Sequence, residues 1–166
     1  MKREEVAEIL NERKKMKLRI IIQSIIIGLG VGILIVINRI MAHNFFNGFK
    51  ELYVKASENV VYSLSLILFI ALVGLVVGFM VKKEPMISGS GIPQVKGRVI
   101  NKIKFNWLRV LVLKFIGGVM ALSVGLSVGR EGPSVQLGAA LGEGISEKFN
   151  KRFPVKKEFL ITAGAS

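Results

Sequence analysis

The segment Gly129–Pro133, with the sequence GREGP, places a cation and a carboxylate between two apolar stretches. Upstream, residues 110–128 contain Lys114 as their only charge, and downstream residues 134–141 are mostly small and apolar. A charge in such a setting costs roughly 2.5–3.5 kcal/mol on insertion scales, so the pair is a candidate functional site. Two glycines permit a turn, and the proline suits the first turn of a new helix. A helix that begins there presents unpaired N–H groups and a positive dipole end, which favour an anion. Glu131, itself an anion, is placed to occupy such a site.

A second irregular segment, Gly89–Pro93 with the sequence GSGIP, repeats this plan about forty residues earlier. Its glycines open the backbone, and Pro93 lies where a short helix would start. The Ser90 hydroxyl can donate to an anion, or it can cap the helix by accepting from first-turn N–H groups. Taken alone, the segment favours a cap or a plain loop. Paired with GREGP across one membrane span, it predicts half-helices that meet near mid-depth from opposite sides of a membrane.

The apolar runs that carry these motifs are typical of an integral membrane protein. Of the 166 residues, 51% are hydrophobic and the mean hydropathy is +0.53. Residues 20–37 and 60–81 contain no charge, and each run is long enough to cross about 30 Å of hydrocarbon. The first run is too long for a signal peptide and lacks a small-residue cleavage site. The chain has no cysteine, so disulfides and cysteine metal sites are excluded.

The net charge of +13 is distributed in clusters that predict the topology. Basic residues gather in residues 1–19, 82–109 and 147–157, whereas residues 39–59 are nearly neutral. The positive-inside rule therefore predicts a multi-pass protein of the cell membrane with a cytoplasmic N-terminus and residues 39–59 outside. Because the basic clusters flank membrane segments, we expect anionic lipid headgroups as their partners and no nucleic acid.

The same patterns divide the chain into segments. We expect a cytoplasmic N-terminal helix in residues 1–17 and a transmembrane domain in residues 18–166. Residues 84–97 contain two prolines and several glycines and serines, so they are not expected to span. Within the domain we expect spans at about 18–40, 58–81 and 107–128, an outer connection at 39–59, a helix at 133–146 too short to cross, and another apolar segment at 156–166.

Small residues recur four apart at Gly28 and Gly32, Gly74 and Gly78, and Gly138 and Gly142. This spacing favours close helix packing, although composition alone can produce it. Several other residues have a simple structural interpretation. Lys114 and Arg130 fit snorkelling or structural pairing, the alternative being a positive field that concentrates anions. His43 is expected to be exposed, and Trp107 to anchor the membrane interface.

The two motifs and their surroundings resemble the CLC family of chloride channels and chloride/proton antiporters. The resemblance extends over about residues 18–166, and its most specific parts are the long motifs 85–95, 113–118 and 129–138. It implies an all-α membrane protein, a CLC-type multi-span helical bundle with broken and re-entrant helices, truncated within the first inverted repeat. The transported species would be chloride, with protons in the antiporters, and no cofactor is implied. The full-length family forms homodimers; whether this chain does is left open.

By this resemblance, Ser90 is the hydroxyl ligand of chloride, and Glu131 is the gate and proton acceptor. The backbone around Gly91 and Ile92 and that around Arg130, Glu131 and Gly132 would line the anion site. Fixed N–H donors and a hydroxyl replace the water shell of a halide without holding it too tightly to conduct. An ionised Glu131 competes for those donors, and protonation releases it, which links proton and anion occupancy. The resemblance also implies that Ser90 favours chloride over nitrate, because nitrate-preferring plant members carry proline there.

The chain departs from the family's pattern in length, since the family's subunits pair two inverted repeats. The expectation is therefore an incomplete anion-transport domain whose action needs the second half. A non-conducting membrane scaffold or interaction partner is the alternative. A membrane enzyme that uses Glu131 as acid or base is not favoured, because no second catalytic carboxylate, nucleophile–base pair or metal cluster accompanies it.

Overall fold

The computed structural model describes residues 3–129, 131–149 and 157–166, and all regular secondary structure in these ranges is helical. This confirms the predicted all-α class. In chain order the elements are α1 (Arg3–Glu58), α2 (Val60–Lys83), the 3-10 helix η1 (Pro85–Ile87), α3 (Ile92–Val99), α4 (Trp107–Ser123), α5 (Glu131–Phe149) and α6 (Lys157–Ala165).

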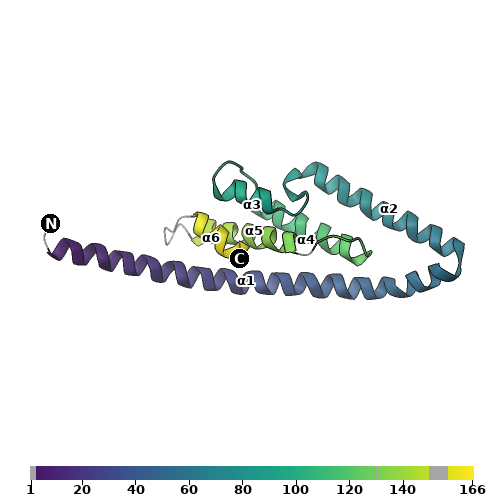
Figure 1. The fold of residues 1–166 in the computed structure, drawn as a ribbon, viewed down its shortest axis with the longest axis horizontal. Coiled ribbons are helices and arrows are strands. Elements are labelled where there is room, and N and C mark those ends of the chain that lie inside the picture. Colours follow the sequence, from purple (N-terminus) through teal and green to yellow (C-terminus); the bar gives the residue numbers. More distant parts are fainter. Residues whose placement is uncertain (1–2, 130, 150–156) are drawn as a thin grey trace.

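Helices α1 and α2 form a long hairpin; α4, α5 and α6 pack along the middle of α1, and α3 lies on α5 and α6 (Figure 1). Asn59 breaks the chain between them with extended backbone, and its side chain accepts a hydrogen bond from the Val61 amide. Helix α1 is 56 residues long, or about 84 Å at 1.5 Å per residue. It therefore far exceeds one membrane thickness.

Helix α1 is continuous through regions that the sequence divides. One helix runs through the described part of residues 1–17, expected as a cytoplasmic N-terminal helix, and through residues 39–58 of the expected outer connection. Packing explains part of the difference: the Tyr53 hydroxyl donates to the carbonyl oxygen of Val124 at 2.7 Å, and Phe46 packs beside Gly125. These contacts hold the second half of α1 against the end of α4.

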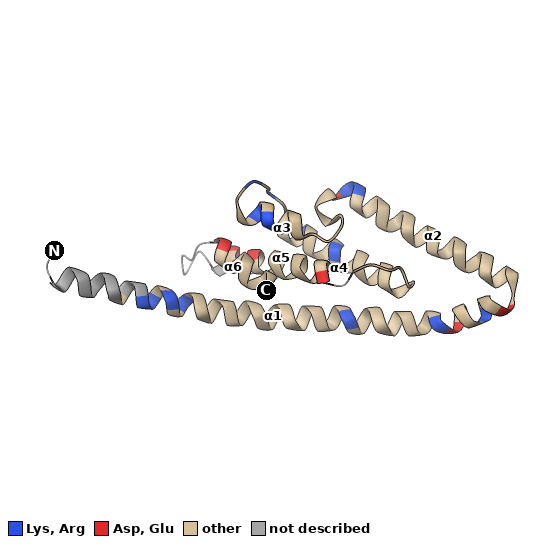
Figure 2. Ribbon diagram, viewed as in Figure 1, with Lys and Arg blue, Asp and Glu red and all other residues tan. Residues whose placement is uncertain are grey.

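Among the described residues, two helices are long and apolar enough to cross a membrane by length and composition, namely the Lys14–Glu58 part of α1 and all of α2. Figure 2 shows that α2 is free of charge between its ends, since Lys82 and Lys83 lie in its last turn. The predicted span at 107–128 is wrong in its extent. Helix α4 ends at Ser123, and Gly125 then takes a positive φ of 71° that turns the chain.

The segment between α2 and α4 is broken, as its prolines and glycines predict. Proline stands near the start of both η1 and α3, and α3 is only eight residues long. Helix α4 begins after Asn106, whose side chain accepts from the amides of Leu108 and Arg109. A polar cap of this kind contributes about 1 kcal/mol to helix stability.

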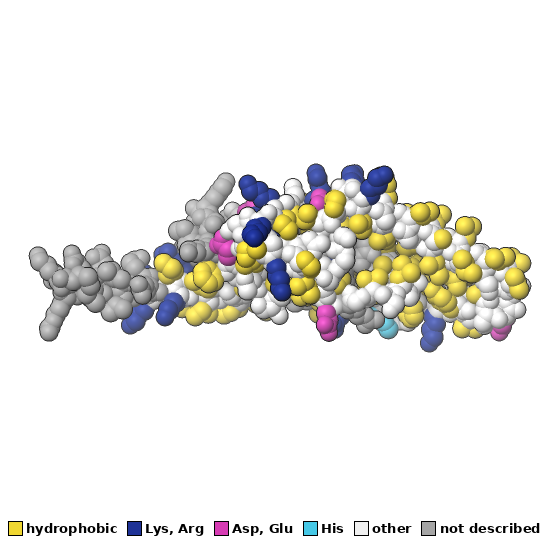
Figure 3. Space-filling model, turned by 45° about the horizontal axis from the view of Figure 1, so that its top comes forward, with side chains coloured by type: hydrophobic (Ala, Val, Ile, Leu, Met, Phe, Trp, Pro, Cys, Tyr) yellow, Lys and Arg dark blue, Asp and Glu magenta, His cyan; other side chains and the backbone are white. Residues whose placement is uncertain are grey.

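The buried core lies where α5 packs against α1, α4 and α6. Small buried clusters join Ile27 of α1 with Leu160 of α6, and Val110 of α4 with Ala140 of α5. Large hydrophobic side chains on α1 and α2 remain mostly exposed, and they cover much of the end formed by this hairpin (Figure 3). Such a surface is expected where lipid is the solvent.

One of the three glycine pairs makes the predicted close contact. A Cβ on Gly138 would collide with the backbone of Gly164, and one on Gly142 would collide with the carbonyl of Leu160. At Gly28, Gly32, Gly74 and Gly78, a Cβ would meet nothing within 4 Å in the described structure. The small-residue spacing therefore serves α5 and α6, and the other two pairs face open space.

Candidate anion site

The two glycine-rich motifs meet at the N-termini of α3 and α5. A Cβ placed on Gly132 would lie 2.6 Å from Cβ of Ser90 and 2.7 Å from the Ser90 carbonyl oxygen. Gly132 is buried, so only hydrogen fits at this position. The predicted meeting of the motifs is thus present in the structure.

The predicted direction of approach is wrong, because α3 and α5 run side by side in the same sense. Ser90 lies at Gly132, Gly91 packs on Gln136, and Val95 shares a buried cluster with Ala139. At the far end of α3, Arg98 pairs with Glu143. The α5 positions 132, 136, 139 and 143 are spaced three or four residues apart, so they lie on one face of α5, and α3 packs against that face along its length. Both positive dipole ends consequently lie at the same end of this pair.

Two left-handed glycines shape the turn that presents Ser90. Gly89 has φ of 60° and Gly91 has φ of 80°, a region that other residues adopt only with strain. The Ser90 hydroxyl oxygen accepts a long hydrogen bond of 3.4 Å from the Ile92 amide. A serine that accepts in this way can still donate its proton, so both predicted uses of Ser90 are compatible with the geometry.

Lys114 fixes the segment before Ser90 from the side of α4. Its Nζ donates to the carbonyl oxygens of Ile87 and Gly89, each at 2.7 Å, and its side chain is 7% exposed. The side chain therefore does not snorkel; it makes the structural pairing given as one of its sequence interpretations. Because the ammonium group keeps its charge close to Gly89, a positive field near Ser90 remains compatible with this geometry.

Gln136 holds the same turn from the side of α5. It is completely buried, and its Nε2 donates to the Met86 carbonyl at 2.6 Å. Its side chain lies against Gly91, where a Cβ would overlap it. Lys114 and Gln136 together restrain residues 86–91 through backbone carbonyls, so the turn is held independently of the side chains it presents.

A cavity of about 440 Å³ opens beside the paired N-termini. Its lining includes Gly89, Ser90, Gly129, Gly132 and Pro133, which come from both motifs, together with Lys114. A second cavity of similar volume lies between α1, α4 and α5. Lys114, Gly129 and Pro133 border both cavities, so the start of GREGP separates two spaces on either side of α4.

The remaining predicted site residues fall into three groups. Glu131 is the first residue of α5 and is exposed, one residue from the Gly132–Ser90 contact. Gly91 is the left-handed residue before α3, and Ile92 begins that helix with 38% exposure. Arg130 lies outside the described residues.

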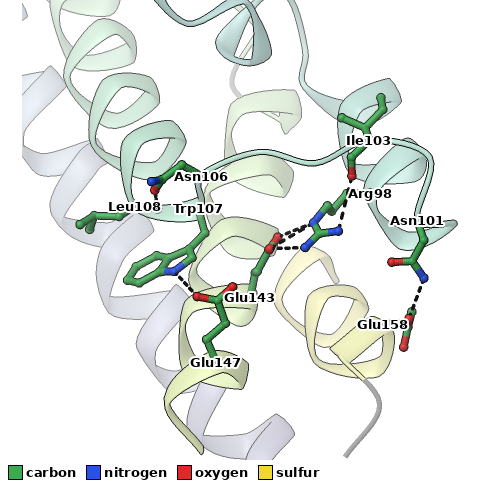
Figure 4. A network of polar contacts seen from close by, with 9 residues as sticks. All are labelled: Arg98, Asn101, Ile103, Asn106, Trp107, Leu108, Glu143, Glu147 and Glu158. Atoms are coloured by element: carbon green, nitrogen blue, oxygen red, sulfur yellow. Dashed lines mark hydrogen bonds and ion pairs between the residues drawn. The ribbon is translucent and has the colours of Figure 1, made fainter. Parts of the chain in front are cut away.

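A polar network joins the other ends of these helices (Figure 4). Arg98 donates from Nε to both Glu143 carboxylate oxygens, at 3.1 and 3.0 Å, and from Nη2 to Oε1 at 2.6 Å. The two side chains are 12% and 1% exposed. Hydrogen bonding to the carboxylate raises the pKa of the Arg98 guanidinium, which outweighs the lowering effect of burial. Trp107 donates to Glu147 and Asn101 to Glu158, both at 2.9 Å.

Sequence reasoning missed Gln136 and Glu143 as parts of this arrangement. In the sequence, Gln136 is simply one residue of the motif 129–138, and Arg98 is one of the basic residues of 82–109. Glu143 carried a usable signal, because it is an isolated carboxylate among the small residues of 138–144. A lone charge in a packed helix needs a partner, which here comes from α3.

These features define the class: a helical membrane protein in which two broken helices bring their N-termini together beside a cavity. The chain belongs to the voltage gated chloride channel family, whose family model matches residues 73–166. It is similar to an H(+)/Cl(-) exchange transporter ClcA of Klebsiella pneumoniae, with 39% identity over 97 residues. It is also 40% identical over 97 residues to the H(+)/Cl(-) exchange transporter ClcA of Salmonella arizonae. Each match covers 58% of this chain and about a fifth of the relative, 21% and 20% of its length.

Proposed function

We propose that this chain forms part of a pathway that moves chloride across a membrane, with Ser90 as an anion ligand and Glu131 as a proton-sensitive gate. The observation that carries the proposal is the direct approach of Gly132 to Ser90, because it brings the hydroxyl and two helix N-termini to one place. Chloride is proposed as the ion because the similar proteins are named H(+)/Cl(-) exchange transporters. The same names support a transport role over an enzymatic one.

The chemistry of the site suits a halide in transit. Backbone N–H groups at a helix start and a hydroxyl supply partial positive charge, which binds an anion without trapping it. Lys114, which borders the cavity, has two of its three donor positions directed at the carbonyls of Ile87 and Gly89. Its charge therefore contributes a field at the cavity while its side chain stays committed to the turn.

Glu131 supports proton linkage through its position. It is exposed at the first turn of α5, where a carboxylate is stabilised by the helix dipole and competes with an anion for the same N–H groups. Protonation removes its charge and so frees the donors for chloride. The proposal includes protons as a second transported ion, membrane lipids as the surroundings and no cofactor. Homodimer formation stays a prediction from the family.

The test is radiotracer chloride efflux from liposomes that contain the purified chain, alone and together with the remaining part of a ClcA relative. We expect efflux when both parts are present. It should fall when Gly132→Ala replaces the native chain, because the methyl group meets the Ser90 backbone.

Three outcomes separate the candidate functions. Efflux that needs both parts supports an anion-transport module. If the chain is folded and inserted but efflux is absent in both preparations, the proposal fails and the non-conducting scaffold replaces it. Efflux from the chain alone supports transport and shows that self-association completes the pathway.

A further inference from the structure

The ion pair between Arg98 and Glu143 lies away from the residues that are proposed to bind the anion, so it has no direct role in that site. Arg98 lies at the C-terminal end of α3, about two turns from Ser90. Its partner Glu143 lies on the face of α5 that also contains Gly132. Both partners are nearly buried, and the guanidinium engages both carboxylate oxygens. Two-pronged contact of this kind fixes orientation as well as distance.

The geometry points to Arg98 and Glu143 as a positioning pair that sets how the N-terminus of α3, and with it Ser90, lies against α5. This inference rests on the proposed anion site. Helix α3 has eight residues, so tilting its far end displaces its first turn relative to Gly132. The pair is thereby expected to control anion discrimination without touching the anion.

Arg98 also has contacts within its own loop, which hold the guanidinium in place independently of Glu143. Its Nη1 donates to the Ile103 carbonyl at 3.5 Å, and its guanidinium carbon lies 5.9 Å from the centre of the Phe105 ring. The turn after α3 folds back tightly, because the amides of Lys102 and Ile103 both donate to the Gly97 carbonyl. The arginine is therefore held by its own loop and presented to α5.

The neighbouring contacts of the network supply a matched control. Glu147 lies one turn beyond Glu143 on α5, but its carboxylate accepts a hydrogen bond from Trp107 of α4 (Figure 4). Glu143→Gln and Glu147→Gln make the same chemical change four residues apart on one helix. Glu143→Gln removes the hydrogen-bonded ion pair with Arg98 of α3, whereas Glu147→Gln removes only a longer-range attraction to the same guanidinium.

The test compares these two variants with Arg98→Lys and with the exchanged pair Arg98→Glu/Glu143→Arg. One readout is the chloride-to-nitrate efflux ratio in the two-part liposome preparation. The second uses spin labels on cysteines introduced at the exposed Lys96 and Lys148, because the chain contains no cysteine of its own. It measures the spread of distances between α3 and α5 by electron paramagnetic resonance. Far-ultraviolet circular dichroism, which follows helix content, reports folding, because Trp107 donates to Glu147 and its fluorescence would respond to Glu147→Gln directly.

We expect Glu143→Gln and Arg98→Lys to change the efflux ratio by roughly threefold or more and to broaden the distance distribution. The exchanged pair should restore both, and Glu147→Gln should change neither. If folded Glu143→Gln and Arg98→Lys proteins keep the native ratio and the native distribution, the inference is overturned. An unchanged ratio with a broadened distribution also rejects control of discrimination.

Failure of the proposed function gives a different pattern. In that case Ser90→Pro and Glu131→Gln leave efflux unchanged, or efflux is absent from every preparation. Distances between the labels then decide the positioning role alone: a native distribution in Glu143→Gln and Arg98→Lys overturns it, and a broadened one that the exchanged pair narrows supports it.

Discussion

Lys114 of α4 donates a 2.7 Å hydrogen bond to the carbonyl oxygen of Gly89, the residue immediately before Ser90. A second bond of the same length reaches Ile87, so one buried ammonium group fixes both ends of a three-residue segment. A broken helix leaves backbone carbonyls that helical neighbours cannot satisfy, and in a membrane protein each of these groups is costly. Lys114 satisfies two of them and at the same time joins α4 to the turn that presents Ser90.

The first prediction concerns this lysine. Lys114→Met keeps most of the side-chain volume but removes both hydrogen bonds. Hydrogen bonds to charged groups contribute about 1.5–3 kcal/mol each, so we expect a loss of a few kcal/mol in the free energy of unfolding. Denaturant titration in detergent, followed by Trp107 fluorescence, measures the loss. Lys96→Met is the control, because Lys96 is exposed on α3. Equal stabilities of the two variants would show that the Lys114 bonds contribute little.

The second prediction concerns the contact between the motifs. Gly132→Ala places a methyl group 2.6 Å from Cβ of Ser90 and 2.7 Å from its backbone oxygen. Backbone atoms cannot rotate away, so α3 and α5 must separate, at a cost of typically 1–3 kcal/mol. We expect reduced stability and a loss of chloride efflux in the two-part preparation. Gly74→Ala in α2 is the control, since its methyl group meets nothing within 4 Å. Native efflux in Gly132→Ala would contradict the geometry of the site.

The third prediction concerns the packing of α5 on α6. Gly138→Ala places a methyl group against the carbonyl of Gly164, a collision with backbone on the neighbouring helix. We expect destabilisation of at least about 1–3 kcal/mol, the usual cost of overpacking. Gly28→Ala on α1 has open space, and alanine is the better helix former by about 1 kcal/mol. Thermal unfolding of the two variants should therefore shift in opposite directions; a shift of Gly138→Ala to higher temperature would refute the contact.

Helices that are defined by a continuous apolar run, or by glycine and proline at their start, were predictable from the sequence. Residues 60–81 form one long apolar run, and Pro93 follows the glycine turn that opens α3, so length and turn chemistry were sufficient. The continuity of α1 was not predictable in this way. Asn44 and Gly48 are typical of a loop, yet contacts from Tyr53 to Val124 hold this stretch as a helix.

The arrangement of the site was predictable only in part. Glycine and proline placement indicated two helix starts, and the resemblance indicated that they meet. Their parallel direction depends on pairings across the chain, such as Arg98 with Glu143, which are 45 residues apart. Hydrophobic periodicity describes which face of a helix is buried and contains no information about which partner covers it.

The fourth prediction concerns selectivity at Ser90. Ser90→Pro removes the hydroxyl that accepts from the Ile92 amide and that is proposed to bind the anion. Because a hydroxyl favours one anion over another through its directed hydrogen bond, we expect the efflux ratio to shift toward nitrate. Efflux of both anions from the same liposome preparation gives the ratio. Ser88→Ala, also exposed in this turn, controls for loss of a nearby hydroxyl. A ratio identical to that of the native chain would exclude Ser90 as a selective ligand.

The fifth prediction concerns the proposed gate. Glu131→Gln keeps the shape of the side chain but carries no negative charge at any pH, so it competes far less strongly with chloride for the N–H groups at the start of α5, and its competition does not depend on pH. Chloride efflux in the two-part preparation should therefore lose its dependence on pH, and the residual rate should resemble that of the protonated native protein. Arg98 does not obscure this measurement: its folded-state pKa is raised, so its contribution to stability is lost only as the pH rises through that value, far above about pH 9. Glu84→Gln, at the junction of α2 and η1, removes a carboxylate elsewhere in the broken segment and should leave the pH profile unchanged. If Glu131→Gln retains the native pH profile, proton control must reside in another group and Glu131 is not the gate.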